Sequence, residues 1–424
     1  MASVLIISKH GDGVPLALRL AMEGHIVKMN ILESAAKSSL EGCHNPSKVA
    51  DPRKLLDQYD LVLNDMAGRG ALCDELASKG KLVLGGGTFN DKLELDREYG
   101  EKVARSLTKA RVPESKSFNR VNDLVKWLSE SGAPQVVKPL GNKPTSLTLV
   151  SSDKQNRAVR SIVMAHATEV VPCLVQERVD GIEVSTEGWF DGTRWVRPFN
   201  HTIEKKRFME GDKGCNTGCM GNVVWPTDGD KLTATVLEPL EPLLKKVGYI
   251  GPLDANTIAT KEAVYWLEWT PRFGYEAIQA WAELLQMSLF DYLYSVATRR
   301  TDQVNVFKEL AIAVRLSIPP YPAAGEEVSF KHTAGYKVID LPDEAKRHVW
   351  LADVKFVDGV PVLAGVDGVI GCVTARGQTV RECERRAYRT IKNIVIHEDV
   401  QYRNDIGSGV EDKRKQLMEW GWIN

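Results

Sequence analysis

Short apolar runs alternate with helically spaced segments over the first ninety residues. An apolar run at residues 3–8 ends in a polar turn, and residues 14–27 then show helical spacing before a further strand. The pattern repeats with apolar runs near residues 61–64 and 81–85. This alternation predicts an open parallel sheet, whose ligands bind at the carboxyl ends of its strands. We therefore expect residues 8–13, 64–70 and 85–88 to share one rim.

A charged amphipathic helix is predicted from residue 91 to 109, and Pro113 starts a second unit. In this unit the pattern predicts helices near 121–131 and 155–167, with strands near 135–140, 146–152 and 173–179. Two hairpins follow, one around Asp191-Gly192 and one over residues 251–271. In the second hairpin, alternation places Asp254 and Asn256 on one face and Glu268 and Thr270 on a neighbouring one.

From about Val328 the pattern becomes rich in strands again, and a helix is predicted from Thr379 to Lys392. The predicted units are residues 1–95, 96–327, with a smaller part at 114–180, and 328–424. The fold class is α/β and α+β, with an N-terminal open parallel sheet and a β-rich C-terminal unit.

Composition narrows the function classes. The chain has 424 residues, with 55 basic and 56 acidic side chains, so it has no global attraction to nucleic acid or to membranes. No long apolar segment is present, and we expect a cytoplasmic location. The seven cysteines lack paired ligand spacing and are expected to be reduced thiols; Cys215 and Cys219, without histidine partners, do not predict a zinc site.

Two segments carry the candidate chemistry. Residues 211–221 form a glycine-broken polar stretch, and residues 266–274 place Glu268 in a tryptophan-rich strand just before Arg272. Backbone N–H groups exposed by Gly214, Gly218 and Gly221 can face anionic oxygens, and a strand carboxylate can hold a bridging metal ion. Arg272 is the competing partner for Glu268 in a salt bridge.

Cations lie at the ends of neighbouring predicted strands. Lys138 ends an apolar strand and could reach phosphates, or it is simply exposed there. Lys205, Lys206 and Arg207 could neutralise a transferred phosphoryl group, or they form a solvated basic turn.

In this order, the segments resemble the ATP-grasp ligases, and within them the glycinamide ribonucleotide synthetases. The likeness rests on GAPQVVKPLG, LVQERVDGIEVS, KKRFMEGDKGCNTGCMG and LEWTPRFG, and on CVTARGQTVRECERRAY and RNDIG near the end. It implies a pre-ATP-grasp domain at 1–95, an ATP-grasp domain of two subdomains at 96–327 and a C-terminal domain. ATP and Mg²⁺ or Mn²⁺ are the implied cofactors.

The resemblance also implies residue roles. ATP would be held by Lys102, Lys138, Glu177, Val179 and Glu183, and the metal by Glu268. The phosphate and acyl-acceptor region would be lined by Arg272, Lys206, Arg207, Asn216, Thr217, Gly218 and Met220.

Several positions depart from the family pattern. At the N-terminal rim, Lys9, His10 and Gly11 and, further on, Arg69 replace the residues that bind phosphoribosylamine, and we expect them to bind the substrate instead. Tyr275 begins a changed segment after Arg272-Phe273-Gly274. In the segment that the resemblance places over the phosphates, this chain has Thr145, Ser146 and Leu147. Thr270 replaces a metal-binding asparagine, and we infer that Asp254 supplies the missing oxygen ligand.

These observations predict an ATP-dependent ligase that joins a carboxylate to an amine through an acyl phosphate. Phosphoribosylamine–glycine ligation is one candidate, and a different amine or amino acid is another, because similarity of fold does not fix the substrate. A nucleotide-binding homologue without catalysis is the third. The expected partners are small molecules, an amino acid and an amine with or without a phosphate group, and the chain is expected to be a monomer or homodimer.

Overall fold

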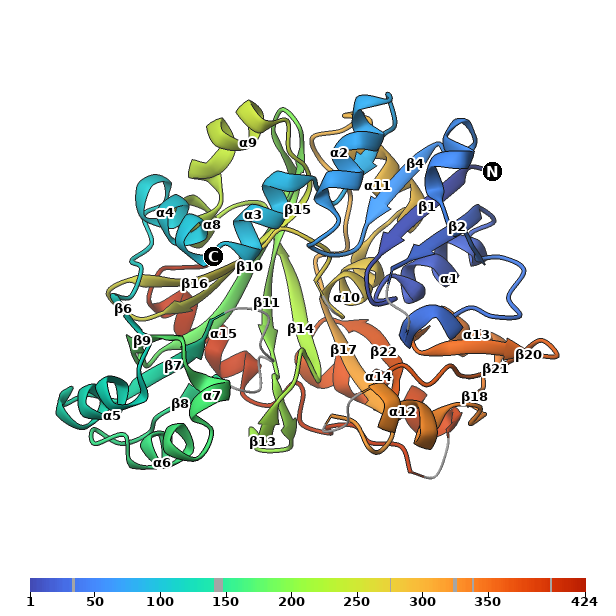
Figure 1. Cartoon of the computed structure of the whole chain (residues 1–424). Coiled ribbons are helices and arrows are strands. Elements are labelled where there is room, and N and C mark those ends of the chain that lie inside the picture. Colours follow the sequence, from blue (N-terminus) through green and yellow to red (C-terminus); the bar gives the residue numbers. More distant parts are fainter. Residues whose placement is uncertain (33–34, 141–147, 275, 323–325, 338, 397–398) are drawn as a thin grey trace.

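The computed structural model describes residues 1–32, 35–140, 148–274, 276–322, 326–337, 339–396 and 399–424. Its N-terminal part is the predicted open sheet (Figure 1), with all strands parallel in the order β3-β2-β1-β4-β5. The three predicted rim segments do lie together, because the backbone N–H of Gly13 donates to Asp65 Oδ2 over 2.6 Å and the Asn64 side-chain amide donates to the Gly85 carbonyl over 3.4 Å. The elements are β1 (Ser3–Ser8), α1 (Val14–Met22), β2 (Ile26–Ile31), η1 (Ala35–Ser38), β3 (Ser47–Lys48), η2 (Pro52–Gln58), β4 (Leu61–Asn64), α2 (Gly70–Ser78) and β5 (Val83–Leu84).

The single helix predicted over residues 91–109 is wrong. The structure has two helices here, α3 (Thr88–Leu95) and α4 (Arg97–Leu107). Asp96 adopts extended backbone angles, and its side chain accepts the N–H of Tyr99 over 3.0 Å. An aspartate cap satisfies a donor of the second helix and so favours a break over a continuous helix.

A small four-stranded sheet forms the predicted part at 114–180 and lies at the lower left of Figure 1. Its own core includes Phe118, Leu124, Leu128 and Val137. The lid residues Thr145, Ser146 and Leu147 lie outside the described residues. The elements are β6 (Ser115–Phe118), α5 (Val121–Glu130), β7 (Gln135–Pro139), β8 (Leu149–Val150), α6 (Arg157–Ala165), α7 (Ala167–Val170) and β9 (Cys173–Glu177).

An eight-stranded sheet runs through the middle of the molecule in the order β16-β15-β10-β11-β14-β17-β22-β19. Both predicted hairpins are confirmed within it, as β10–β11 and β15–β16. The sheet contains strands from both sides of the predicted boundary at residue 328, because β17 pairs with β22. The predicted C-terminal unit therefore shares a sheet with the preceding one. The strands are β10 (Ile182–Asp191), β11 (Trp195–Glu204), β14 (Gly221–Thr227), β15 (Ile250–Ala259), β16 (Val264–Thr270), β17 (Leu310–Ser317), β19 (Val349–Leu351) and β22 (Val369–Gly377).

The remaining elements surround this sheet. The chain around Val328 is helical rather than extended, and the predicted late helix is α14, which Thr379 caps by accepting the N–H of Glu382. The helices are α8 (Lys231–Val236), η4 (Glu238–Leu240), α9 (Glu241–Val247), α10 (Ala277–Leu284), α11 (Leu289–Ala297), α12 (Glu326–Thr333), α13 (Asp343–Lys346), α14 (Val380–Asn393) and α15 (Val410–Glu419). The short strands are β12 (Arg207–Met209), β13 (Lys213–Asn216), β18 (Ile339–Asp340), β20 (Val354–Val357), β21 (Val360–Leu363) and β23 (Val395–Ile396).

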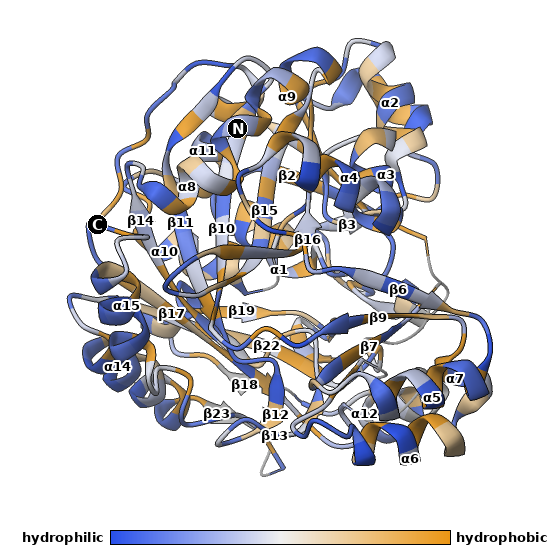
Figure 2. Ribbon diagram, turned by 90° about the vertical axis from the view of Figure 1, so that its left-hand side faces the viewer, coloured by the Kyte–Doolittle hydropathy of each residue, from blue (hydrophilic) through white to orange (hydrophobic). Residues whose placement is uncertain are grey.

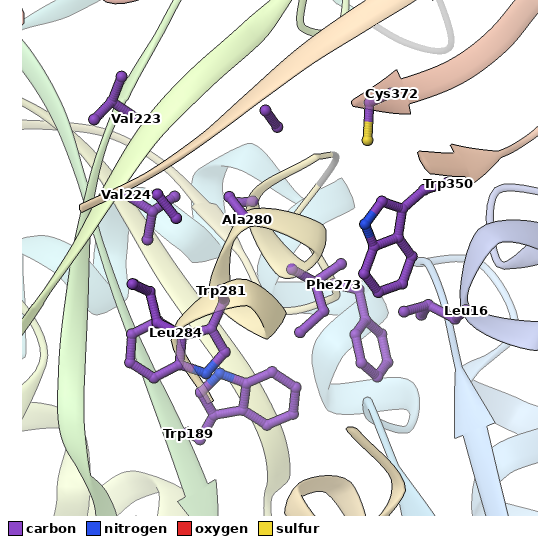
Figure 3. Close-up of a cluster of buried hydrophobic side chains, with 14 of the residues drawn as sticks. Leu16, Trp189, Val223, Val224, Phe273, Ala280, Trp281, Leu284, Trp350 and Cys372 are labelled. Atoms are coloured by element: carbon purple, nitrogen blue, oxygen red, sulfur yellow. The ribbon is translucent and has the colours of Figure 1, made fainter. Parts of the chain in front are cut away.

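One apolar core joins the N-terminal, central and C-terminal parts. Figure 3 shows Trp189 and Trp281 packed beside Leu284, with Phe273 and Trp350 on the side towards Leu16. The Trp189 and Phe273 rings meet edge to face, with centroids 5.6 Å apart. Burying side chains of this size contributes about 2–3 kcal/mol each, so this core holds the parts in one arrangement. Hydrophilic positions dominate the outer helix α14 (Figure 2).

Candidate functional site

A cavity of about 90 Å³ lies between the hairpin β15–β16 and the strands β10 and β11. In the hairpin, Asp254 lies opposite Thr270 and Asn256 lies opposite Glu268. The predicted neighbourhood of these faces is therefore confirmed. Gly218 lines the same cavity as Glu268, so the 211–221 segment and the strand carboxylate also meet in space as the sequence predicts.

Lys206 is the central cation of this cavity. Its Nζ lies 2.8 Å from Glu183 Oε1 and 3.6 Å from Glu204 Oε2. The Asn256 amide donates to Glu183 over 3.4 Å and to Glu268 over 3.5 Å, which ties the strand carboxylates together. Burial opposes the charge on Lys206, but Glu183, Glu204 and Glu268 raise its pKa well above the ordinary value, so it stays protonated.

Glu268 is ionised despite its surroundings. Its side chain is exposed along the cavity, and the partial desolvation by surrounding chain opposes ionisation. The charges of Lys206, Lys138, Arg97 and Arg272 nevertheless lower its pKa. A carboxylate held among cations is suited to a divalent ion bridging phosphate oxygens.

Lys138 lies at the end of β7, facing this cluster. Burial first, and then the nearby Arg97, lower its pKa to about 8, while Glu268 and Glu101 act in the opposite direction. Arg97 of α4 therefore lowers the pKa of both Lys138 and Glu268, and the sequence analysis missed this residue. Lys102 is exposed and lines a separate groove between α4 and the small sheet.

Arg272 forms an ion pair with Glu94 of α3, with Nε 2.9 Å from Oε1. The sequence suggested Glu268 as the salt-bridge partner of Arg272, but the partner in the structure is Glu94. The positive charge of Arg272 still helps to lower the Glu268 pKa. Arg272 still lines the cavity beside Glu268.

The glycine-rich segment is a β-hairpin rather than an open loop. Arg207 pairs with Asn216 across β12 and β13, and Arg207 Nη1 donates to the Gly214 carbonyl over 2.8 Å. The expectation that Gly221 presents its N–H to a ligand is wrong, because that N–H donates to Cys219 Sγ over 3.3 Å. A Cβ at Gly221 would approach the Ala313 carbonyl to 2.4 Å, so this glycine allows close strand packing instead.

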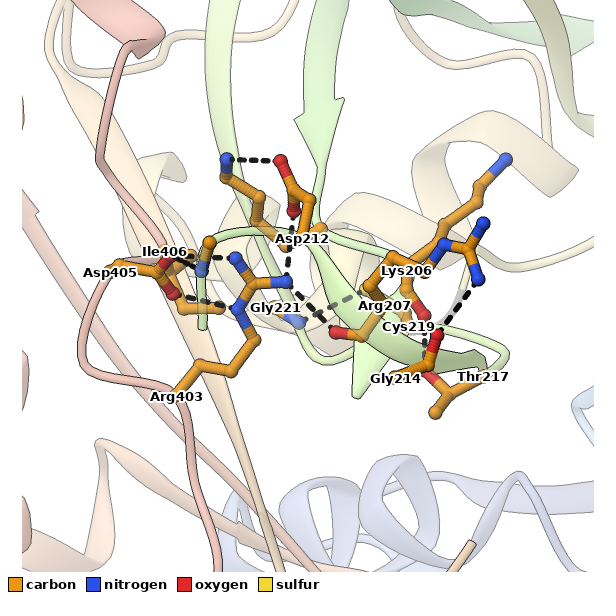
Figure 4. A network of polar contacts seen from close by, with 12 residues as sticks. Lys206, Arg207, Asp212, Gly214, Thr217, Cys219, Gly221, Arg403, Asp405 and Ile406 are labelled. Carbon is orange, nitrogen blue, oxygen red and sulfur yellow. Dashed lines mark hydrogen bonds and ion pairs between the residues drawn. The ribbon is translucent and has the colours of Figure 1, made fainter. Parts of the chain in front are cut away.

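The C-terminal part fixes the hairpin through Arg403 and Asp405, which lie on the left-hand side of Figure 4. Arg403 is 1% exposed, and its guanidinium contacts Asp405 at 2.7 Å and Asp212 at 3.0 Å. It also donates to the Arg207 carbonyl over 2.8 Å. Residue Thr217 donates through both its N–H and its hydroxyl to the Lys206 carbonyl. These contacts hold Lys206 and Arg207 in place at the cavity mouth, whereas the Met220 side chain is fully buried in the core.

Asp254 and Asn256 are the oxygen donors that could join Glu268 at a metal ion. Asp254 Oδ1 and Asn256 Oδ1 are buried and have no hydrogen-bond partner among the described residues. Burial, then Glu187 and Glu204, raise the Asp254 pKa well above its ordinary value. The described residues hold no preformed group of three acidic, histidine or cysteine ligands. Such a partial donor set suits Mg²⁺, which takes its other ligands from phosphates and water.

Sequence reasoning missed Glu187, Glu204 and Asn256, as well as Arg97. Glu187 is 4% exposed and lies opposite Asp254, and burial raises its pKa to about 7. Its polar position within the apolar strand β10 was the available signal. Asn256 was placed on the correct face but given no role.

The other predicted residues lie around the edges of the cavity. Glu177 is exposed at the end of β9, Val179 follows it before β10, and Glu183 bonds Lys206 as described. At the N-terminal rim, His10 and Gly11 line a second cavity of about 290 Å³, and Lys9 and Arg69 are not among its described lining residues. Arg69 instead donates to Asn30 Oδ1 over 2.9 Å. Tyr275 lies outside the described residues.

Comparison with known proteins identifies the central unit. Residues 99–277 match the family described as phosphoribosylglycinamide synthetase, ATP-grasp (A) domain. The central part of the chain is thus similar to an ATP-grasp domain of this type. Its first ninety-eight residues lie outside that match, and the described residues contain no helix long and apolar enough to cross a membrane.

Similarity to whole proteins extends beyond the ATP-grasp domain. The phosphoribosylamine–glycine ligase of Caldanaerobacter subterraneus is 26% identical over 80% of this chain and 81% of its own length. That of Streptomyces coelicolor is 28% identical over 80% of each chain. The solved phosphoribosylamine–glycine ligase from Thermotoga maritima has a TM-score of 0.70 at 21% identity, covering 95% of this chain and 99% of its own. The biotin carboxylase of Campylobacter jejuni has the same fold at a TM-score of 0.64 and 12% identity.

Proposed function

We propose that this protein is an ADP-forming ligase that joins a carboxylate to an amine. The observation that carries the proposal is that Glu268 and Lys206 line one cavity within the stretch that matches an ATP-grasp domain, with the charge of Lys138 near enough to lower the Glu268 pKa. The curated relatives are named as ligases that use glycine and phosphoribosylamine. Their overall similarity supports the same class of reaction here.

The proposed reaction has two steps. A carboxylate oxygen attacks the γ-phosphorus of ATP, an O–P bond forms, and ADP leaves. The amine nitrogen then attacks the acyl phosphate, a C–N bond forms, the C–O bond to phosphate breaks, and one amine proton is lost. Positioning and neutralisation of charge account for most of the catalysis in such transfers.

The residues divide this work. Lys138 and Lys206 would neutralise phosphate oxygens, with Arg97 and Arg272 supporting the same negative charge. Glu268 would hold Mg²⁺, with Asp254 or Asn256 as a second oxygen ligand and Thr270 beside them. A bound Mg²⁺ polarises the phosphoryl oxygens it contacts.

The nucleotide and hairpin contacts complete the proposed site. Glu177, Val179 and Glu183 would contact adenine and ribose, and Lys102 would contact phosphate from the outer groove. Arg207, Asn216, Thr217 and Gly218 would line the phosphate and acyl-transfer region. Lys9, Arg69, Met220 and Tyr275 remain predictions as substrate contacts, as do a cytoplasmic location and a monomeric or homodimeric state.

A second candidate is a homologue that binds nucleotide without turnover. Thr270, at the place where the resemblance predicts a metal-binding asparagine, favours it, whereas the charged cluster at Glu268 and Lys206 opposes it. Release of ADP separates the two. We expect ADP formation to rise when an amino acid and an amine are added together to protein, MgCl₂ and ATP, with the amide product identified by mass. Binding of Mg·ATP with no ADP from any pair would support the second candidate.

A further inference from the structure

The cavity of about 290 Å³ lies between the turn after β1, the start of α10 and the C-terminal strands β19 and β22. Gly218 lines both this cavity and the smaller one beside Glu268, so the two are adjacent. A molecule in the larger cavity would therefore lie next to the cavity in which the proposed acyl phosphate forms. The cavity walls combine Trp350 with polar groups from all three parts of the chain.

Several acidic and amide residues that line this cavity each have one oxygen without a hydrogen-bond donor among the described residues. Three buried side chains each have an oxygen with no partner among the described residues: Glu276 Oε2, Gln279 Oε1 and Asp353 Oδ1. Their residues are only 6%, 7% and 4% exposed. Asp12 Oδ2, in the N-terminal turn, is a fourth such oxygen. Leaving buried acceptors unpaired is costly, so a ligand that donates hydrogen bonds would relieve it.

The same walls carry an excess of negative charge. Asp12, Glu276, Asp353 and Asp367 all line the cavity. Arg315 is the guanidinium among the lining residues, and it is already engaged, with Nε 2.5 Å from Glu276 Oε1 and Nη1 2.9 Å from the Tyr321 hydroxyl. Burial and the neighbouring Asp353 raise the Asp367 pKa to about 6, as expected where carboxylates are crowded.

The backbone keeps Glu276 in this position. Glu276 has φ of 52°, in the left-handed region that non-glycine residues rarely adopt, immediately before α10. Such a conformation persists only where surrounding contacts stabilise it, and here Glu276 forms an ion pair with Arg315. One Glu276 oxygen is bound to Arg315, which leaves the other for a ligand.

We propose that this cavity takes the amine substrate, and that this substrate is a cationic, donor-rich amine without a phosphate group. The inference rests on the proposed ligase function and specifies its acceptor. An ammonium or hydroxyl-bearing amine would donate to the four unpaired oxygens, whereas a phosphate dianion would face carboxylates and gain no free guanidinium from the lining residues. Lys9 and Arg69, two cations that the sequence predicts to bind the substrate, are absent from the described lining.

Two matched pairs of probes test this proposal: glucosamine with glucosamine 6-phosphate, and ethanolamine with phosphoethanolamine. Each pair differs only by the phosphate. Calorimetry on the full chain saturated with Mg·ADP should show at least one unphosphorylated amine binding ten times or more tightly than its phosphorylated partner. Tighter binding of a phosphorylated probe would overturn the proposal, and so would no binding by any of the four at millimolar concentration.

Variants connect the preference to the cavity. The double variant Asp12→Asn and Asp367→Asn removes two negative charges and should reduce the preference for the unphosphorylated probe at least threefold. Asp123→Asn, on the exposed face of α5, is the matched control and should leave the preference unchanged. An equal preference in all three proteins would place amine binding elsewhere.

Affinity for Mg·ATP is measured separately on the same samples. Normal nucleotide binding with a reversed amine preference would contradict only the inference about this cavity. Absence of nucleotide binding would contradict the ligase proposal itself.

Discussion

The two adjacent cavities differ in how their charges are balanced. Around Glu268, carboxylates lie among cations, and the Lys206–Glu183 contact of 2.8 Å is one of several such pairings. Around Asp353, carboxylates gather with one guanidinium that Glu276 already binds. The first cavity is therefore prepared for a polyanion with its metal ion, and the second for a hydrogen-bond donor. The local balance of charge thus distinguishes the proposed nucleotide site from the proposed amine site.

The largest expected effect follows from removing the charge at Glu268. Glu268→Gln keeps the side-chain size but cannot hold a divalent ion as strongly, so ADP formation should fall about 10²–10³-fold. Steady-state ADP release at saturating Mg·ATP measures this. Glu262→Gln, in the exposed turn of the same hairpin, is the control and should retain full activity. Equal activity of both variants would exclude Glu268 from the reaction.

Next in size is the effect of Lys138 on nucleotide affinity. Its pKa of about 8 means that it is protonated below this pH and loses its charge above it. Calorimetry with Mg·ADP should show affinity falling about tenfold between pH 7 and pH 9. Lys138→Arg should bind with a weaker dependence on pH, because an arginine stays charged. A wild-type affinity that is constant over this range would show that Lys138 does not contact the phosphates.

A smaller effect distinguishes the second metal ligand. Asp254→Ala should raise the Mg²⁺ concentration for half-maximal activity several-fold if Asp254 supplies an oxygen. Asn256→Ala should do so if the amide oxygen opposite Glu268 is used instead. Titration of activity with MgCl₂ compares the two variants directly. An unchanged requirement in Asp254→Ala would refute its role as a ligand.

The smallest expected effect concerns stability near the second cavity. Burial and the neighbouring Asp12 raise the Asp65 pKa to about 8, above its value in the unfolded chain. The folded protein then binds a proton that the unfolded chain releases, so this residue's contribution to stability falls as pH rises towards 8. Between pH 6 and pH 7, the free energy of unfolding should fall by about 1 kcal/mol more in the wild type than in Asp65→Asn.

Urea unfolding at the two pH values measures this difference. The exposed Asp57→Asn is the control and should follow the wild type. Parallel behaviour of the wild type and Asp65→Asn would mean that Asp65 is ionised in the folded state.

Local pattern was enough to predict much of the fold. Alternation of polar and apolar residues identified the parallel sheet and both hairpins, and it placed the face with Asp254 and Asn256 next to the face with Glu268 and Thr270. It failed between residues 91 and 109, where one capping aspartate ended a helix that periodicity alone would continue. The meeting of Glu268 with the 211–221 segment was predictable because these residues stand next to strands with recognisable turns.

What only the tertiary structure decided is which distant groups meet. Arg97 reaches the Lys138 and Glu268 cluster from another helix, and Arg403 fixes the hairpin from almost two hundred residues away. The cavity of unpaired acceptors likewise combines Asp12, Gln279 and Asp353 from three parts of the chain. The sequence determined the strands and the candidate phosphate residues, because these depend on neighbours along the chain. The balance of charge in each cavity depends on packing between segments, which no local pattern records.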